Sequence, residues 1–146
     1  MKKIIYLFAL LCSLLLVGCG SEDSPKGEKN TPGNTASLFF NALYNEQDLD
    51  KATQFATPKL TRIMKSYGTA NQFARNLINM QYDEVIIEVD MTDMSIRQQY
   101  GDKATINLIF TGYFNGTKID EMRSVKMIRK KGNWYIEKIN PDPFAR

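Results

Sequence analysis

The spacing of apolar residues changes at Val85, and this change constrains the fold more than any other feature of the chain. Before Val85, apolar residues recur every three or four positions, which is typical of amphipathic helices. From Val85 onward they alternate with polar residues, as in strands that bury one face. Helices followed by strands predict the α+β class, with N-terminal helices packed on one face of a curved antiparallel sheet.

Four residues mark where helices are expected to begin. Thr31 and Thr57 each precede a proline, which fits an N-cap followed by proline in the first helical turn. Asp48 and Thr69 can cap two further helical segments, and Gly68 is expected to end the helix that follows Thr57. The N-terminal half of the domain is therefore expected to be helical.

Turn signals divide the second half into four strands. Asn115-Gly116 is typical of a type I′ hairpin turn, and Gly101-Asp102 and Lys131-Gly132-Asn133 mark two other turns. Three consecutive hairpins predict a four-stranded antiparallel meander. The alternation changes phase near Asp93, where a β-bulge would reconcile the two phases. Apolar positions of one parity are expected to face the helices: Val85, Ile87, Val89, Met91, Ala104, Ile106, Leu108, Phe110, Trp134 and Ile136.

The N-terminal segment has the parts of an export signal. Lys2 and Lys3 precede an apolar stretch over residues 4–17, which is short for a transmembrane helix. The stretch ends in Leu16-Val17-Gly18-Cys19, which resembles the lipobox of bacterial lipoproteins, in which the cysteine is acylated and becomes the mature N-terminus. We therefore expect Cys19 to carry lipid. The alternative is an ordinary secretory signal that ends near a cysteine.

The chain is expected to have three parts: a lipoprotein signal peptide at 1–18, a flexible tether at 19–30, and one α+β domain at 31–146. Lipid on Cys19 would anchor the domain in the bacterial cell envelope. Gly20 follows the cysteine, where an aspartate usually signals retention in the inner membrane, so the outer membrane is expected in an organism with two membranes. Glu22-Asp23 resembles the acidic signals of surface-exposed lipoproteins.

Composition excludes several kinds of chemistry. The chain contains no histidine, and its two cysteines are Cys12, inside the signal, and Cys19. The mature domain would lack a disulfide, a thiol nucleophile and the imidazole on which serine triads and most zinc sites depend. Nineteen basic residues against sixteen acidic ones give no sign of a nucleic-acid partner. No phosphate-binding loop or EF-hand spacing occurs, and we expect no metal or cofactor.

The order of the elements is similar to that of a known superfamily. Thr31-Pro32 with Phe39-Phe40, then Thr57-Pro58, and a meander that closes on Gly132-Asn133-Trp134-Tyr135-Ile136 resemble the NTF2-like, cystatin-like superfamily, in particular small bacterial lipoproteins of the DUF4878 type. The resemblance covers roughly residues 31–140. It implies a cone of helices and sheet that is open at one end, inside which some relatives use Asp, Tyr or His as isomerases, dehydratases or hydrolases.

Two classes of function are compatible with these features. The first is a non-catalytic binding module for an envelope protein, a peptide or a small ligand. Aromatic residues would line its pocket: Phe40, Tyr44, Phe73, Phe110 and Trp134. Alternatively, these aromatics fill the core, as regularly spaced aromatics usually do.

The second class is a small pocket enzyme. Asp90 or Asp93 would act as the base, and Tyr44, Tyr67 or Tyr113 would donate a hydrogen bond. The parity of Asp90 favours a hydrated position, and the inward strand positions named above contain no acid or lysine. We therefore expect a binding module without catalytic residues.

Basic residues gather around the last hairpin: Lys126, Arg129, Lys130, Lys131 and Lys138. They fit two interpretations, contact with anionic lipid or glycan phosphate, and a solvated sheet edge protected by lysines.

Overall fold

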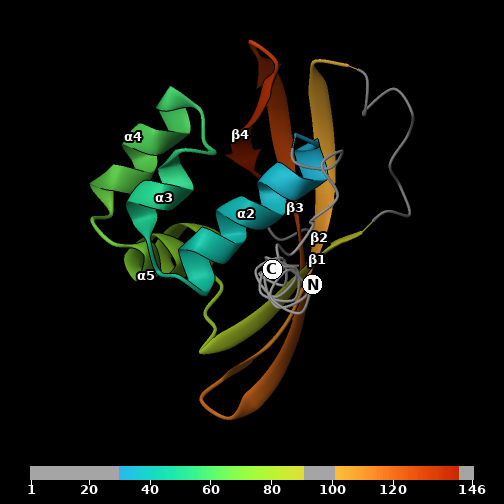
Figure 1. Ribbon diagram of the computed structural model, residues 1–146. Helices are drawn as coiled ribbons and strands as arrows, with labels where there is room; N and C mark the ends of the chain where they lie inside the picture. The colour runs from blue at the N-terminus through green and yellow to red at the C-terminus, as the bar shows by residue number, and fades with distance from the viewer. Residues whose placement is uncertain (1–29, 91–100, 142–146) are drawn as a thin grey trace, which may run out of the picture.

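The computed structural model describes residues 30–90 and 101–141, which form helices followed by antiparallel strands (Figure 1). This arrangement confirms the α+β class. The elements are helices α2 (Pro32–Tyr44), α3 (Leu49–Thr53), α4 (Pro58–Ser66) and α5 (Ala70–Phe73), the π-helical turn η1 (Ala74–Ile78), and strands β1 (Glu84–Asp90), β2 (Lys103–Phe114), β3 (Thr117–Lys130) and β4 (Asn133–Ile139).

The expected N-caps all function as caps. The side chains of Thr31, Asp48, Thr57 and Thr69 each accept a hydrogen bond from the backbone N–H three residues later. Gly68 follows α4 with a φ of 81°, a conformation that stops the helix at low steric cost. The segment expected after Thr69 is a single turn, α5, that continues into η1.

The sheet is the expected meander, with strand order β1-β2-β3-β4 and antiparallel neighbours. Asn115 and Gly116 both have positive φ, as do Lys131 and Gly132, and each pair forms the two-residue turn of a hairpin. The expected bulge at Asp93 and the inward position of Met91 lie outside the described residues. A register shift does occur in β3, between Lys126 and Met127.

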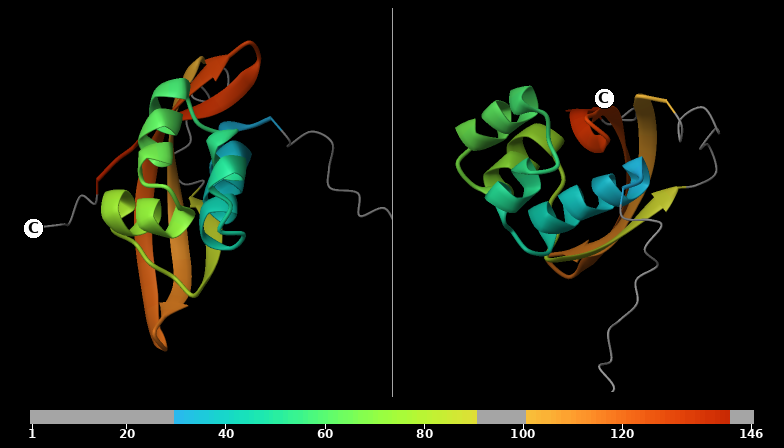
Figure 2. Two further views of the ribbon diagram at one scale, coloured as in Figure 1. Left: turned by 90° about the vertical axis from the view of Figure 1, so that its left-hand side faces the viewer. Right: turned by 45° about the horizontal axis from the view of Figure 1, so that its top comes forward.

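The helices lie on one side of the sheet, and α2 contacts β1, β2 and β4 (Figure 2). Burial alternates along the strands as expected: Val85 is buried, whereas its neighbour Ile86 is 66% exposed. Trp134 and Ile136 are both buried, which confirms the parity of the last strand. Side chains from α2 therefore meet one face of the sheet and form the core between the two layers.

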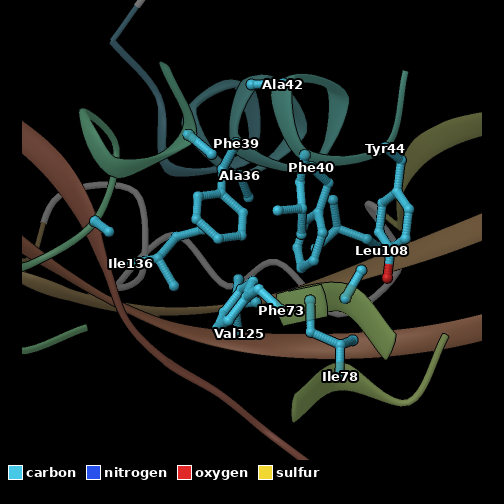
Figure 3. Close-up of a cluster of buried hydrophobic side chains, with 14 of the residues drawn as sticks. Ala36, Phe39, Phe40, Ala42, Tyr44, Phe73, Ile78, Leu108, Val125 and Ile136 are labelled. Carbon is cyan, nitrogen blue, oxygen red and sulfur yellow. The ribbon is translucent and has the colours of Figure 1, made fainter. Parts of the chain in front are cut away.

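Aromatic rings form the centre of this core (Figure 3). Phe40 packs edge to face against Phe39 and Phe110, with ring centroids 5.0 Å apart in both pairs. Such edge contacts stabilise a core beyond the burial of apolar area alone. The core thus joins α2 directly to the middle of β2.

The free edge of β4 is paired over part of its length. The connection between α3 and α4 runs beside it, where the Thr57 N–H donates to the Ile136 carbonyl at 2.9 Å. The Ile136 N–H donates in turn to the Phe55 carbonyl at 2.8 Å. A short parallel bridge between Ala56 and Ile136 therefore covers this part of the edge and reduces its capacity to pair with another chain.

Candidate binding pocket

The structure places the five aromatic residues of the expected pocket mainly in the core. Phe40, Phe73 and Phe110 have no exposed surface, and Trp134 is almost fully buried. Tyr44 is the member of this set that lines a described cavity. In the described part of the chain, the aromatic residues therefore act chiefly as packing, and Tyr44 connects that packing to the pocket described below.

A pocket of about 400 Å³ opens where the end of α2, the α5–η1 segment and the start of β1 meet. This volume lies within the range of small-molecule sites. We call it the tyrosine pocket. Its lining residues are Tyr44, Gln47, Asn71, Gln72, Ala74, Arg75, Met80, Gln81, Tyr82, Asp83 and Phe114.

Tyr82 forms the buried wall of the tyrosine pocket. Its ring stacks on Phe110, with centroids 6.3 Å apart, and meets Tyr44 edge to face at 5.5 Å. The residue is 8% exposed, and its hydroxyl is buried with no hydrogen-bond partner among the described residues. Leaving a buried hydroxyl unsatisfied typically costs about 1–3 kcal/mol, so Tyr82 brings an unsatisfied polar group to the lining of the pocket.

Tyr44 carries the second hydroxyl of the pocket. It donates a hydrogen bond to the Met80 carbonyl at 3.4 Å. Burial raises the pKa of both Tyr44 and Tyr82 well above the usual value. Both phenols therefore stay protonated near neutral pH, where they can donate hydrogen bonds but are poor proton acceptors.

A charged pair lies on the inward face of β3, a strand for which no inward positions were predicted. Arg123 is opposite Leu108 and is 3% exposed, and Glu121 is opposite Phe110. Arg123 Nη2 lies 3.4 Å from Glu121 Oε2, and its Nη1 donates to the Met122 carbonyl at 2.9 Å. The negative charge of Glu121 also contributes to the raised pKa of Tyr82.

The parity of β3 could have identified this pair. Counting back in steps of two from the buried Val125 leads to Arg123 and then Glu121. The apolar Met122 between them is 47% exposed and faces the opposite side. The predicted inward positions lie on β1, β2 and β4, so they do not include these two residues of β3.

The structure does not bring the other proposed catalytic residues into the tyrosine pocket. Asp90 is the half-buried last residue of β1, and Asp93 lies outside the described residues. Tyr67 packs its ring against Phe73, and Tyr113 is exposed. The acid that does line the pocket is Asp83, whose Oδ2 accepts a hydrogen bond from the Asn115 N–H at 2.8 Å.

Within residues 30–90 and 101–141, no group of three potential metal-ligating side chains is close enough to hold an ion. No helix in the same ranges is long and apolar enough to cross a membrane. Cys19, the expected lipidation site, lies outside the described residues.

Comparison of the chain with protein-family models, curated proteins and solved structures found no match.

Proposed function

We propose that this protein is an envelope lipoprotein, anchored by lipid on Cys19, whose domain binds a small hydrogen-bonding ligand without changing it chemically. We also propose that the domain is an NTF2-like cone with a largely packed interior and a ligand site beside the sheet. The observation that carries the binding function is the buried hydroxyl of Tyr82 in the wall of the tyrosine pocket.

The chemistry of the lining supports a ligand rich in hydroxyl and amide groups. Four carboxamide side chains surround the pocket, and each can both donate and accept hydrogen bonds. They belong to Gln47, Asn71, Gln72 and Gln81. The ring of Phe114 adds an apolar surface. An N-acetylated amino sugar presents hydroxyl groups, one amide and an apolar ring face. We therefore propose that the ligand is an N-acetylated amino sugar.

The protonation state of the two tyrosines in the pocket also supports binding without catalysis. General acid–base work near neutral pH requires a group whose pKa lies near the working pH. Tyr44 and Tyr82 have pKa values raised by burial, in the direction away from neutral pH. The Tyr82 hydroxyl is suited to donating a hydrogen bond to a ligand, whereas the Tyr44 hydroxyl already donates to the Met80 carbonyl. Both phenols are poorly suited to removing a proton from a ligand.

Titration of the isotope-labelled protein with N-acetylglucosamine and its disaccharide, followed by amide NMR, tests this proposal. Saturable shifts are expected in residues 71–75 and 80–83, which line the pocket. Tyr82→Phe removes one hydroxyl and should weaken binding about threefold to tenfold. Tyr113→Phe is the matched control, because that side chain is exposed and lies outside the pocket lining. Equal affinity in the two variants would show that the Tyr82 hydroxyl does not contact the ligand.

A second candidate function is a pocket enzyme, and one observation favours it: Asp83 lines the same pocket as Tyr44 and Tyr82. Ester, epoxide and enolisable ketone substrates incubated with the wild type and with Asp83→Asn distinguish the two functions. Saturable turnover that disappears in the variant would replace the binding proposal, whereas turnover in neither protein would support it.

The anchor is tested separately. Cys19→Ser should abolish the mass increment of the acyl chains and move the protein from the membrane fraction to the soluble fraction. A variant that stays in the membrane would contradict lipidation at Cys19. For the wild type, protease shaving of intact cells then tests whether the domain lies at the cell surface, where it should be cut without lysis.

A further inference from the structure

A second cavity, of about 570 Å³, lies between α4, η1 and the last residues of β4. It shares no lining residue with the tyrosine pocket. Four apolar side chains form its floor: Leu60, Ile63, Leu77 and Ile139. Three lysines from three different elements line it as well: Lys59, Lys126 and Lys138. We call this cavity the lysine groove and these three residues its rim.

Two of the rim lysines are paired on neighbouring strands. Lys126 of β3 and Lys138 of β4 are direct cross-strand partners, and like charges in that position are destabilising. Lys59, at the start of α4, adds a third positive charge to the same cavity. Among the described residues, no carboxylate lies within ion-pair distance of any of these three ammonium groups.

The register shift next to Lys126 produces this arrangement. Met127 pairs with Ile136 and Lys126 pairs with Lys138, so Glu137 is the extra residue on β4. Glu137 also lines the groove, as its one carboxylate among the described residues. The lining therefore carries three positive charges and one negative charge, and this net positive charge favours an anionic ligand.

The floor of the groove is apolar and partly open to solvent. Ile63 lies on α4 and is 37% exposed, whereas Leu77 and Ile139 are half-buried at the margin of the core. An apolar ligand chain on this floor would remove these side chains from water. The groove thus offers an apolar surface and a cationic rim within one cavity of ligand size.

We propose that the lysine groove binds an amphipathic carboxylate with a linear alkyl chain, such as a free fatty acid. The carboxylate lies among the three rim lysines, whose positive charge it offsets, and the chain lies on the floor formed by α4 and η1. This site is independent of the proposed tyrosine-pocket function, because a different set of residues forms it.

Photocrosslinking tests the proposal on the full mature chain in phosphatidylcholine nanodiscs. A photoreactive dodecanoate is titrated, and the labelled peptides are mapped by mass spectrometry. Saturable labelling is expected around Ile63 and Ile139, with competition by unlabelled dodecanoate and weaker competition by dodecanol. Labelling spread evenly over the protein, or equal competition by the alcohol, would overturn the proposal.

Charge variants make the test specific. Lys126→Gln combined with Lys138→Gln should weaken dodecanoate binding about fivefold to tenfold, since two exposed ion pairs are lost. Lys130→Gln combined with Lys131→Gln is the matched control, because it removes the same charge from the hairpin outside the groove. An equal loss of dodecanoate affinity in both double variants would indicate general electrostatic attraction and would overturn the proposed site.

Two further measurements complete the test. Without ligand, Lys138→Gln should raise Tm slightly because it removes one of two facing charges, whereas Lys131→Gln should not. An unchanged Tm in Lys138→Gln would contradict the repulsion on which the site rests. Labelling that requires anionic phosphatidylglycerol in the nanodisc would assign the groove to a membrane surface and overturn the fatty-acid proposal.

Discussion

Tyr82 lies against Gly112, and the missing side chain of this glycine makes room for the tyrosine ring. A Cβ atom at Gly112 would stand 2.7 Å from Tyr82 Cδ1 and 2.3 Å from the Glu84 carbonyl oxygen. Real Cβ atoms do not approach other atoms so closely. Gly112 therefore lets β1 approach β2 and lets Tyr82 reach its stacking position on Phe110.

Gly112→Ala should lower the free energy of unfolding by about 1–3 kcal/mol or more. The added methyl group would clash with the Glu84 carbonyl oxygen, which is part of the strand backbone and cannot rotate away as a side chain could. Urea denaturation measures this loss. Gly33→Ala is the control, since the nearest atom there is a Val89 side-chain carbon at 3.3 Å. Equal midpoints for the two variants would contradict the close packing of Tyr82 and Gly112.

The two buried tyrosines predict a loss of stability in alkali. Burial raises the pKa of Tyr44 and Tyr82 in the folded protein, so their contribution is fully present below the unfolded value of about 10. Above that pH the unfolded phenols ionise while the folded ones resist. The free energy of unfolding should fall by up to about 1.4 kcal/mol per pH unit for each tyrosine.

Urea unfolding at pH 9 to 11.5 measures this slope. A double variant, Tyr44→Phe with Tyr82→Phe, has neither phenol and should show a shallower decline over the same interval. Tyr82→Phe alone should raise the free energy of unfolding at pH 7 by about 1–3 kcal/mol, because it removes a buried hydroxyl that has no partner among the described residues. Identical alkaline slopes in the wild type and the double variant would contradict the burial of the phenols.

Trp134 anchors the last strand to the core. It is almost fully buried, so Trp134→Ala should lower the free energy of unfolding by about 3–5 kcal/mol. Tyr135 is next to it on the opposite face and half-buried, and Tyr135→Ala should cause a smaller loss. Thermal denaturation of both variants checks the strand parity, and a larger loss at Tyr135 would reverse it.

The elements whose signals are local were predictable from the sequence. Thr31 and Thr57 cap helices because a threonine hydroxyl before a proline satisfies the first free backbone N–H groups. Asn115-Gly116 forms its turn because these residues tolerate positive φ. The parity of Trp134 follows from the alternation of its own strand.

The pocket and the groove depend on contacts that are distant in sequence. Tyr82 reaches the wall of its pocket because Gly112, thirty positions later, leaves it space. Lys126 faces Lys138 because a register shift displaces β4 by one residue, which the alternation in either strand does not reveal. Arginine is usually exposed at the protein surface, so the burial of Arg123 could not be expected from its residue type.

Arg123 holds its charge in the core beside a neighbouring carboxylate. Arg123→Ala removes the partner that lies 3.4 Å from Glu121 and leaves that partly buried carboxylate with less compensation. Breaking a buried pair in this way should lower the free energy of unfolding by about 3 kcal/mol.

The pair as a whole should be less important to stability than either member alone. Arg123→Met combined with Glu121→Leu replaces both charges by apolar side chains and should recover most of the loss, because no buried charge is then left uncompensated. Urea denaturation of the wild type, Arg123→Ala and the double variant measures the three free energies. If the double variant were less stable than Arg123→Ala, the Arg123–Glu121 pair would itself be a net source of stability, contrary to this prediction.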